Sequence, residues 1–374
     1  MLETPTPLWQ LAEDTLARGD ADAIAALLRD HFFDSVDALT AFAAAERDPA
    51  SPTARFEAAA DALVSGDLAT LTRLLHEDPS LVRARSARRH RATLFHYVGS
   101  NGVESVRQRA PTNIVAIAAA LLDAGADVNA TAPVYGERDT TLALAATSIH
   151  PVEAGVLEPL LTFLFARGAT VDGPGGWSAL INACHANGRP AAAEFLAART
   201  MDGDLDLEAA GGLGRLDVVE RHFDGRGGLV GATAEQARDA FTWACEYGRT
   251  PVVLFLLRQG QAVDARLPKH HGQTGLHWAA WGGHVDTVRA LLAAGAAVDI
   301  RDDRFGGTPL GWALHAWSGG RRHDDPRPYV EVAQQLVAAG ARVDHEWLAH
   351  GDRGTPWADA LRAAPDMRNA LELS

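Results

Sequence analysis

The stretch from Thr274 to Ile300 constrains the fold of this chain most, because it holds two short helical patterns back to back. The first begins at Gly275 and ends at Gly282-Gly283, since glycine tolerates the left-handed backbone that closes many helices. The second has apolar residues at spacings of three and four, which indicates a helix with one buried face: Val285, Val288, Leu291 and Leu292. Gly295 ends this helix, and an extended turn follows. The stretch therefore predicts helix, tight turn, helix and turn within one period.

This period resembles a unit of the ankyrin repeat family, which is about 33 residues long and has the signature T-P-L-H-x-A. Related patterns recur along the chain after residue 53, for example at Thr93–Tyr97, Thr140–Leu142 and Thr308–Leu310. The resemblance implies an all-α solenoid of about eight to nine stacked helix-turn-helix units with short projecting β-turns. In that family the first helices and the projecting turns line a concave face, and the second helices form the convex back.

The first 52 residues have helical patterns that lack the repeat signature. A helix pair is expected from Leu8 to Asp34, and Asp48–Pro52 has the composition of a linker. Charged faces on the first pair suit a cap that closes the end of a solenoid against water. We therefore expect an N-terminal helical cap over residues 1–52 and an ankyrin repeat solenoid over residues 53–374, in which Thr355-Pro356-Trp357 begins a final partial unit.

Composition limits the classes of partner and location. Apolar residues make up 47% of the chain and charged residues 22%, which is typical of a globular protein. The net charge of -14 argues against a general nucleic-acid or anionic-membrane partner. No stretch reaches the ~18 apolar residues of a membrane span, and Cys184 and Cys245 form no metal-binding spacing. We expect a cytoplasmic protein without a membrane segment, a cofactor or a metal ion.

Three of the expected units are longer than the others at one joint, between the first and second helix. Gly283 and Leu291 are eight residues apart, whereas Gly102 and Leu121 are nineteen apart. The three insertions carry Arg107 and Arg109, His150 and Pro151, and Arg321, Arg322 and His323. Because stacked repeats place equivalent loops along one edge, these insertions could wall off one side of a groove.

Aligning the expected units gives two columns of equivalent residues. The resemblance implies that both columns lie on the solvent-facing side of the first helices. One column reads Tyr97, Leu144, Asn182, Ala209, Trp243, Trp278 and Trp312, and the column three residues later reads Ser100, Thr147, His185, Gly212, Glu246, Trp281 and His315. The tryptophans predict a contiguous aromatic strip, and exposed aromatic area of this kind usually marks a binding surface. The alternative is that these rings pack as additional core, since large aromatic residues are highly buried on average.

Most histidines in the chain have a simple structural interpretation. His96 and His277 occupy the signature histidine position, where the family uses the side chain to hydrogen-bond neighbouring backbone, and His270-His271 fall in a projecting turn. His185, Glu246 and His315 come from separate units and could form a metal or acid–base site only by assembly. Since the sequence has no HExxH, CxxC, GxSxG or Walker-type motif, it identifies no catalytic residue and no metal ligand.

Basic residues are concentrated at a few places in this acidic chain. The run Arg83–Arg91 falls in a projecting turn, and Arg107, Arg109, Arg321 and Arg322 fall in the insertions. Although charge runs are more often solvated faces, their position favours an anionic ligand, either an acidic peptide or a small carboxylate- or phosphate-bearing molecule.

Two functions remain open on the sequence alone. The first is a recognition module that binds a partner protein or an acidic peptide through an aromatic-lined concave groove. The second is a small-molecule-binding protein or atypical enzyme, whose pocket is closed by the insertions and holds an anionic ligand. The candidate binding residues in either case are Tyr97, Asn182, His185, Trp243, Glu246, Trp278, Trp281, Trp312, His315, Arg107 and Arg109.

Overall fold

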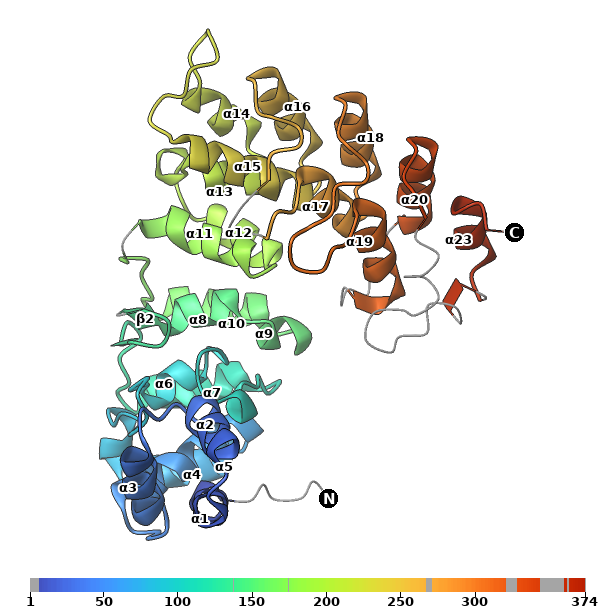
Figure 1. Ribbon diagram of the computed structural model, residues 1–374. Helices are drawn as coiled ribbons and strands as arrows, with labels where there is room; N and C mark the ends of the chain where they lie inside the picture. Colours follow the sequence, from blue (N-terminus) through green and yellow to red (C-terminus); the bar gives the residue numbers. More distant parts are fainter. Residues whose placement is uncertain are drawn as a thin grey trace. The chain divides into compact units, whose positions relative to one another are not determined.

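The computed structural model describes residues 7–136, 138–173, 175–266, 271–320, 328–343, 360–361 and 363–373 (Figure 1). It is mostly helical and forms two compact units. Unit 1 comprises Met1–Gly176 with Ala186–Phe195, and unit 2 comprises Trp177–His185 with Leu196–Ser374. His270, Arg321, Arg322, His323, Thr355 and Trp357 lie outside the described residues, so the expectations placed on them stay predictions. Within the described residues, no helix combines the length and the apolar character needed to cross a membrane.

Unit 1 begins with three helices that share a small core of their own. These helices are α1 (Leu8–Arg18), α2 (Ala21–Asp30) and α3 (Val36–Glu46). Side chains from all three segments are buried together, including Leu8, Leu27, Leu39 and Phe42. Helix α3 also packs against the next helix along the chain. A capping role for this N-terminal bundle stays a prediction.

The rest of unit 1 consists of helix pairs. The pairs are α4 (Pro52–Ser65) with α5 (Leu68–Glu77), α6 (Leu94–Tyr97) with α7 (Ile114–Asp123), and α8 (Thr141–Thr147) with α10 (Leu157–Ala166). First helices pack on first helices and second helices on second helices, which gives two layers. The joints of the longer units contain a 3-10 turn (Ser105–Arg107) and the short helix α9 (His150–Glu153). A two-stranded antiparallel hairpin, β1 (Thr131–Ala132) and β2 (Asp139–Thr140), precedes α8.

Helices α11 (Gly176–Ala186) and α12 (Pro190–Ala197) contribute residues to both units. Unit 2 continues with four further pairs: α13 (Leu207–Leu213) and α14 (Leu216–Val219), α15 (Ala234–Glu246) and α16 (Thr250–Arg258), α17 (Gly275–Gly282) and α18 (Val285–Ala293), α19 (Pro309–His315) and α20 (Tyr329–Ala338). Within this unit the first helices follow one another in one layer and the second helices in another (Figure 1). The last described helix, α23 (Pro365–Ala370), packs on α20. The all-α repeat architecture is confirmed, and the exact number of units stays a prediction.

The signature residues explain where helix α17 begins and ends. At the start of α17, Nδ1 of His277 accepts a hydrogen bond from the Thr274 backbone N–H over 3.1 Å and lies 2.9 Å from the Thr274 hydroxyl. The other ring nitrogen, Nε2, lies 3.2 Å from the Gly307 carbonyl oxygen of the next turn. At the end of α17, Gly283 has φ 70° and its N–H closes the helix on Ala279 and Ala280. The structural role expected of the signature histidine is confirmed.

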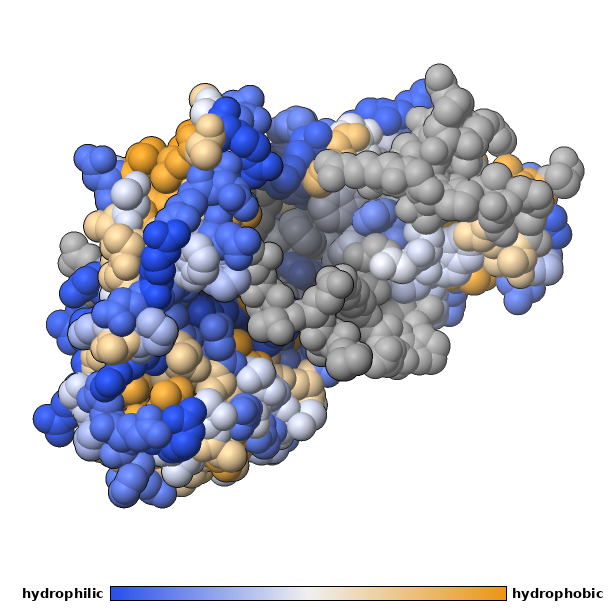
Figure 2. Space-filling model, turned by 90° about the horizontal axis from the view of Figure 1, so that it is seen from below, coloured by the Kyte–Doolittle hydropathy of each residue, from blue (hydrophilic) through white to orange (hydrophobic). Residues whose placement is uncertain are grey.

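Exposed apolar side chains are distributed along the chain rather than gathered. Figure 2 shows one face of the molecule, on which small hydrophobic patches lie between hydrophilic residues. Among the residues that the structure describes, the large exposed hydrophobic side chains are those of Val36, Val106, Tyr135, Val152, Met201, Val230, Leu254 and Phe305. Isolated residues of this kind are ordinary on a protein surface. Phe305 differs from them in its surroundings, because it borders a pocket.

Candidate functional site: an aromatic pocket in unit 2

The pocket has a volume of about 410 Å³ and is lined by the first helices of two neighbouring pairs and the loop between the pairs. Its lining residues are Trp278, Trp281, Phe305, Gly307, Gly311, Trp312 and His315. The three tryptophans and His315 are half-buried, whereas Phe305 is 62% exposed. The aromatic side chains of the pocket are therefore accessible to a ligand.

Trp312 is the central ring of the pocket. Its centroid lies 5.3 Å from that of Trp278 and 5.7 Å from that of Trp281, with interplanar angles of 70° and 72°. The Phe305 ring is 6.5 Å away at 62°. These are edge-to-face contacts, which hold aromatic rings in defined orientations. The rings thus meet at steep angles and form walls rather than a flat stack.

Helical geometry brings these side chains together. Trp278 and Trp281 are three residues apart on α17, and Trp312 and His315 are three residues apart on α19, so each pair lies on one face of its helix. Because α17 packs against α19, the two faces adjoin. The His315 ring stacks on the Trp281 ring at 5.6 Å and 20°. The two columns predicted from the sequence are brought together in these two units.

A buried carboxylate fixes the loop side of the pocket. Oδ2 of Asp302 accepts hydrogen bonds from Nε1 of Trp312 over 3.1 Å and from the Gly307 N–H over 2.9 Å. Oδ1 accepts from the backbone N–H groups of Arg304 and Phe305, over 2.9 and 2.7 Å. Burial alone would raise the pKa of Asp302, but these donors outweigh it and hold the pKa below its ordinary value. Asp302 therefore stays ionised and orients both Trp312 and Phe305.

Glycine is required beside Trp312. A Cβ atom at Gly307 would lie 2.9 Å from Nε1 of Trp312, within the distance of its hydrogen bond to Asp302. The missing side chain lets the indole lie against the loop backbone. This close approach explains why the segment before Thr308 contains glycine.

The remaining candidates in unit 2 lie away from the pocket lining. Trp243 on α15 is buried, and its Nε1 donates to Oε1 of Glu208 over 2.9 Å. His185 is buried against Trp243 and Tyr247, with ring centroids 6.4 and 5.3 Å away. Burial lowers the pKa of His185 to about 3, so the ring is neutral at physiological pH.

The expectation of a solvent-facing column is therefore wrong at Trp243, His185 and Glu246, all of which are buried. Neighbouring first helices approach closely here, since a Cβ atom at Gly212 on α13 would lie 2.3 Å from the His185 ring. Asn182 is half-buried, and its Nδ2 lies 3.3 Å from both carboxylate oxygens of Asp206. Trp243 therefore packs as part of the core, which was the alternative to a binding surface.

The candidates in unit 1 also need correction. Tyr97 is fully buried, and its hydroxyl donates to Oε1 of Glu104 over 3.2 Å. Arg107 is buried as well: its Nη1 donates to Glu57, and its Nε donates to Oδ1 of Asp61 over 2.7 Å. The expectation that Arg107 offers positive charge to a ligand is therefore wrong. Arg109 is exposed, as expected.

The basic run Arg83–Arg91 supplies a second cation to the same internal network. Nη1 of Arg88 donates to Oε1 of Glu57 over 2.6 Å, and its Nε lies 2.6 Å from Oε1 of Glu104. Its guanidinium also lies over the Phe42 ring of α3, 4.5 Å from the centroid. Arg88 is thus a buried link between the N-terminal bundle and the helix pairs, rather than part of a binding surface.

Sequence reasoning missed Phe305 and Asp302. The available signal was the segment Asp302–Gly307, in which an acidic residue precedes an aromatic residue and two glycines directly before a unit signature. Among the described residues, no cluster of three or more His, Cys, Asp or Glu side chains is placed to hold a metal ion. Of the pocket's lining residues, His315 is the one with an imidazole side chain.

A comparison with protein-family models agrees with the repeat pattern in unit 2. A family model described as ankyrin repeats (3 copies) matches residues 207–302 and 241–346, which include the pocket. Inversin from Danio rerio is 40% identical over 67 residues, which are 18% of this chain and 7% of inversin. The crystal structure of the human ASB11 ankyrin repeat domain aligns with 21% identity over 76% of this chain and 99% of that chain, with a TM-score of 0.36. The chain thus matches only a small part of inversin's length.

Proposed function

We propose that this chain, which is an ankyrin repeat protein, is a recognition module whose unit 2 binds a segment of a partner protein at the aromatic pocket. Ankyrin repeats are generally protein-interaction modules, and that generalisation gives the class of function. The observation that supports this site is the set of reachable rings around Trp312, namely Trp278, Trp281 and Phe305.

Aromatic pockets of this kind suit a large apolar or aromatic side chain. Tryptophan and tyrosine dominate binding energies at interfaces because they bury a large area with few rotatable bonds. The rings here are held in place by Asp302 and by contacts with one another, so little side-chain freedom is lost on binding. A partner residue inserted between them would replace water along several ring faces.

A small-molecule-binding protein is the second candidate, and the volume of the pocket supports it. About 410 Å³ falls within the range of roughly 300–1,000 Å³ that is usual for small-ligand sites. An enzymatic role has weaker support, since His185 and Glu246 are not among the residues that line this pocket. Acid–base chemistry here would depend on His315 alone among the lining residues.

A peptide-display selection on the full chain tests the proposal. Random peptides are selected in parallel on four proteins. These are the wild type, the single pocket variants Trp281→Leu and Phe305→Ala, and the control variant Tyr135→Ala. Tyr135 is a matched control because it is an aromatic residue of unit 1 that is 68% exposed. We expect peptides with a large apolar residue to be enriched by the wild type and the control and lost from the pocket variants. Equal enrichment on all four proteins would contradict the proposal.

A further inference from the structure

A buried negative charge adjoins the aromatic pocket. Asp302 is ionised and 3% exposed, and its four hydrogen bonds all come from neutral N–H groups, two of which belong to the lining residues Trp312 and Gly307. Within the described part of the chain, no ion pair includes Asp302. The neighbouring imidazole of His277 is neutral at physiological pH, because burial lowers its pKa to about 4. Since buried charges in proteins are normally paired, a cation in the pocket would compensate this carboxylate.

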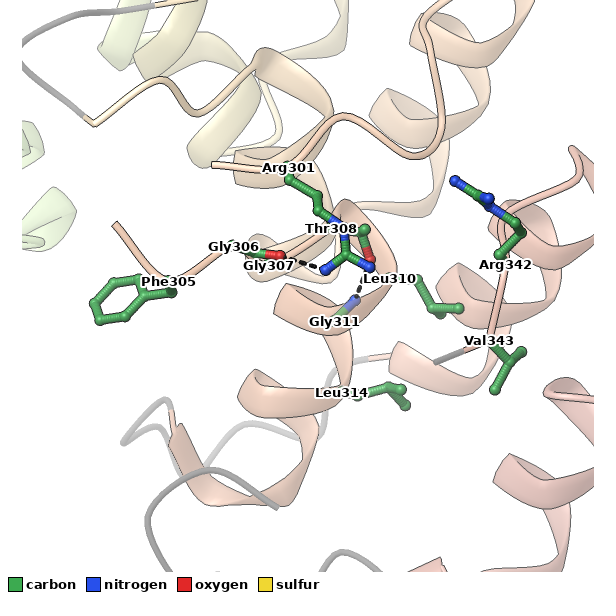
Figure 3. Close-up of a pocket in the computed structure, with 10 residues that line it drawn as sticks. All are labelled: Arg301, Phe305, Gly306, Gly307, Thr308, Leu310, Gly311, Leu314, Arg342 and Val343. Carbon is green, nitrogen blue, oxygen red and sulfur yellow. Dashed lines mark hydrogen bonds between the residues drawn. The ribbon is translucent and has the colours of Figure 1, made fainter. Parts of the chain in front are cut away.

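The arginines of the same loop region are directed elsewhere. A second, smaller pocket of about 90 Å³ adjoins the aromatic pocket and shares Phe305 with it. Arg301 and Arg342 line this smaller pocket, and Figure 3 shows the Phe305 ring pointing away from both. Nη1 of Arg301 donates to the Gly306 carbonyl oxygen over 2.7 Å, and Nε of Arg342 donates to Asp299 over 2.9 Å. Neither arginine is among the residues that line the aromatic pocket.

The rings of the aromatic pocket are arranged as the walls of a box. Trp278, Trp281 and Phe305 meet the central Trp312 at angles of 70°, 72° and 62°. Walls at these angles surround a rounded group, whereas a flat ligand would stack on one wall only. Aromatic faces attract cations, and indole does so most strongly. Phe305 already makes such a contact within the chain, since Cζ of Arg304 lies 5.1 Å from its centroid.

The lining offers few acceptors to a cation that carries N–H groups. Among the lining side chains, only the imidazole of His315 has an acceptor nitrogen. The Gly307 carbonyl oxygen is engaged by the Asp302 N–H over 3.0 Å and by Nε2 of His277 over 3.2 Å. An unmodified lysine would lose water from three N–H donors without regaining partners for them. Methylation keeps the charge of the ammonium group, and a trimethylated lysine has no N–H left to satisfy.

We propose that the aromatic pocket, with the negative charge of Asp302 beside it, selects a quaternary ammonium group, presented as a trimethylated lysine on the partner segment. This inference rests on the proposed function, because it names the side chain that the partner segment inserts. The hydrogen bond from Trp312 to Asp302 supports it further, since a carboxylate at the indole N–H polarises the ring towards negative charge. The large apolar residue expected from a random peptide is then the uncharged substitute for this group. The ligand is thus opposite in charge to the one that the sequence predicts.

The test starts from the strongest display-selected peptide and uses the full chain. Its large apolar residue is replaced, in separate peptides, by trimethyllysine, by unmodified lysine, and by the neutral isostere in which carbon takes the place of the ammonium nitrogen. Isothermal titration calorimetry measures the three dissociation constants. We expect trimethyllysine to bind about tenfold more tightly than the isostere, as a partly desolvated cation–π contact would give. Unmodified lysine should bind more weakly than either.

Two variants locate the source of this ratio. Asp302→Asn removes the buried charge, and Trp278→Leu replaces an aromatic wall by an aliphatic one, so both should bring the ratio of the two dissociation constants closer to one. Asp303→Asn is the control, because it removes an exposed carboxylate from the same loop and should leave the ratio unchanged. A change in the shape of the pocket alters both affinities, whereas their ratio reports the charge.

The outcomes separate this inference from the proposed function. An isostere that binds the wild type as tightly as trimethyllysine would overturn the quaternary ammonium site and leave the proposed function standing. A ratio that persists unchanged in both Asp302→Asn and Trp278→Leu would overturn the site as well. No peptide enrichment on the wild type would overturn both.

Discussion

The indole N–H of Trp312 donates to a carboxylate oxygen of Asp302 over 3.1 Å, and this contact joins the loop after α18 to the face of α19. The same carboxylate accepts the N–H groups that shape the turn containing Phe305. A single buried side chain therefore sets the positions of two pocket walls. The binding properties of the pocket should depend on Asp302 even though it is not one of the lining residues.

Asp302→Asn should disturb the pocket and lower stability. The amide oxygen can accept hydrogen bonds, but the amide NH₂ group cannot. The NH₂ group would therefore face either backbone N–H donors or the indole N–H, and neither can accept a hydrogen bond from it. Leaving buried donors unsatisfied costs roughly 1–3 kcal/mol. Urea unfolding measures that loss, and near-UV circular dichroism reports the tryptophan environment. Asp303→Asn, a change at the exposed neighbour, should alter neither, and an unchanged spectrum for Asp302→Asn would contradict the role assigned to Asp302.

Acidification below neutral pH should destabilise the fold through its buried histidines. Burial lowers the pKa of His277 to about 4, whereas an unfolded histidine titrates near 6.5. The unfolded chain then binds more protons, so the stability present above about pH 6.5 is lost as the pH falls towards 4.

His277→Gln tests that contribution at one residue. Glutamine can keep the cap, as Gln236 does at the start of α15 by accepting the Thr233 N–H over 3.0 Å. Between pH 7 and pH 5, the free energy of unfolding should fall by about 2 kcal/mol more in the wild type than in the variant. Parallel pH profiles for the two proteins, measured by chemical unfolding, would show that folding does not lower the pKa of His277.

Arg88→Met should be strongly destabilising. The change leaves Glu57 and Glu104 buried with one cation fewer, and breaking a buried ion pair in this way costs about 3–5 kcal/mol. Arg73→Met is the matched control, because Arg73 pairs with Glu77 on the exposed face of α5 and should have little effect. Similar melting temperatures for the two variants would contradict the assignment of Arg88 to a buried network.

Trp243→Ala and Phe305→Ala should separate the core from the binding surface. Trp243 is 3% exposed and Phe305 is 62% exposed. Truncating a buried tryptophan costs about 3–5 kcal/mol, whereas an exposed substitution usually changes stability by less than about 0.5 kcal/mol. Thermal unfolding of both variants checks this order. Comparable losses would mean that Phe305 belongs to the core.

The helical part of the site could be predicted from the sequence for a geometric reason. Residues three apart share a helix face, and the repeat period aligns equivalent faces of α17 and α19, so Trp278, Trp281, Trp312 and His315 were predictable as neighbours. The period fixes which residues form a column. It does not fix which members of a column are buried: Trp243 is buried, whereas Trp278 is half-buried.

The loop side of the site could not be predicted in the same way. Phe305 is placed by the hydrogen bonds of Asp302, which depend on a turn that has no helical period. Arg342 reaches the smaller pocket from the segment after α20, forty-one residues from Arg301 along the chain. In unit 1, Arg107 pairs with Glu57 fifty residues away, a contact that a charge count cannot reveal.

The most direct test of the central claim is the affinity of a display-selected peptide for the wild type and for Phe305→Ala, measured by isothermal titration calorimetry on the full chain. Phe305 is suited to this test because its exposed ring borders both pockets and its removal should leave the fold intact. The account predicts a dissociation constant about tenfold higher for Phe305→Ala, an unchanged value for Tyr135→Ala, and melting temperatures equal to that of the wild type. Equal dissociation constants for the wild type and Phe305→Ala would contradict the claim that this pocket binds the partner.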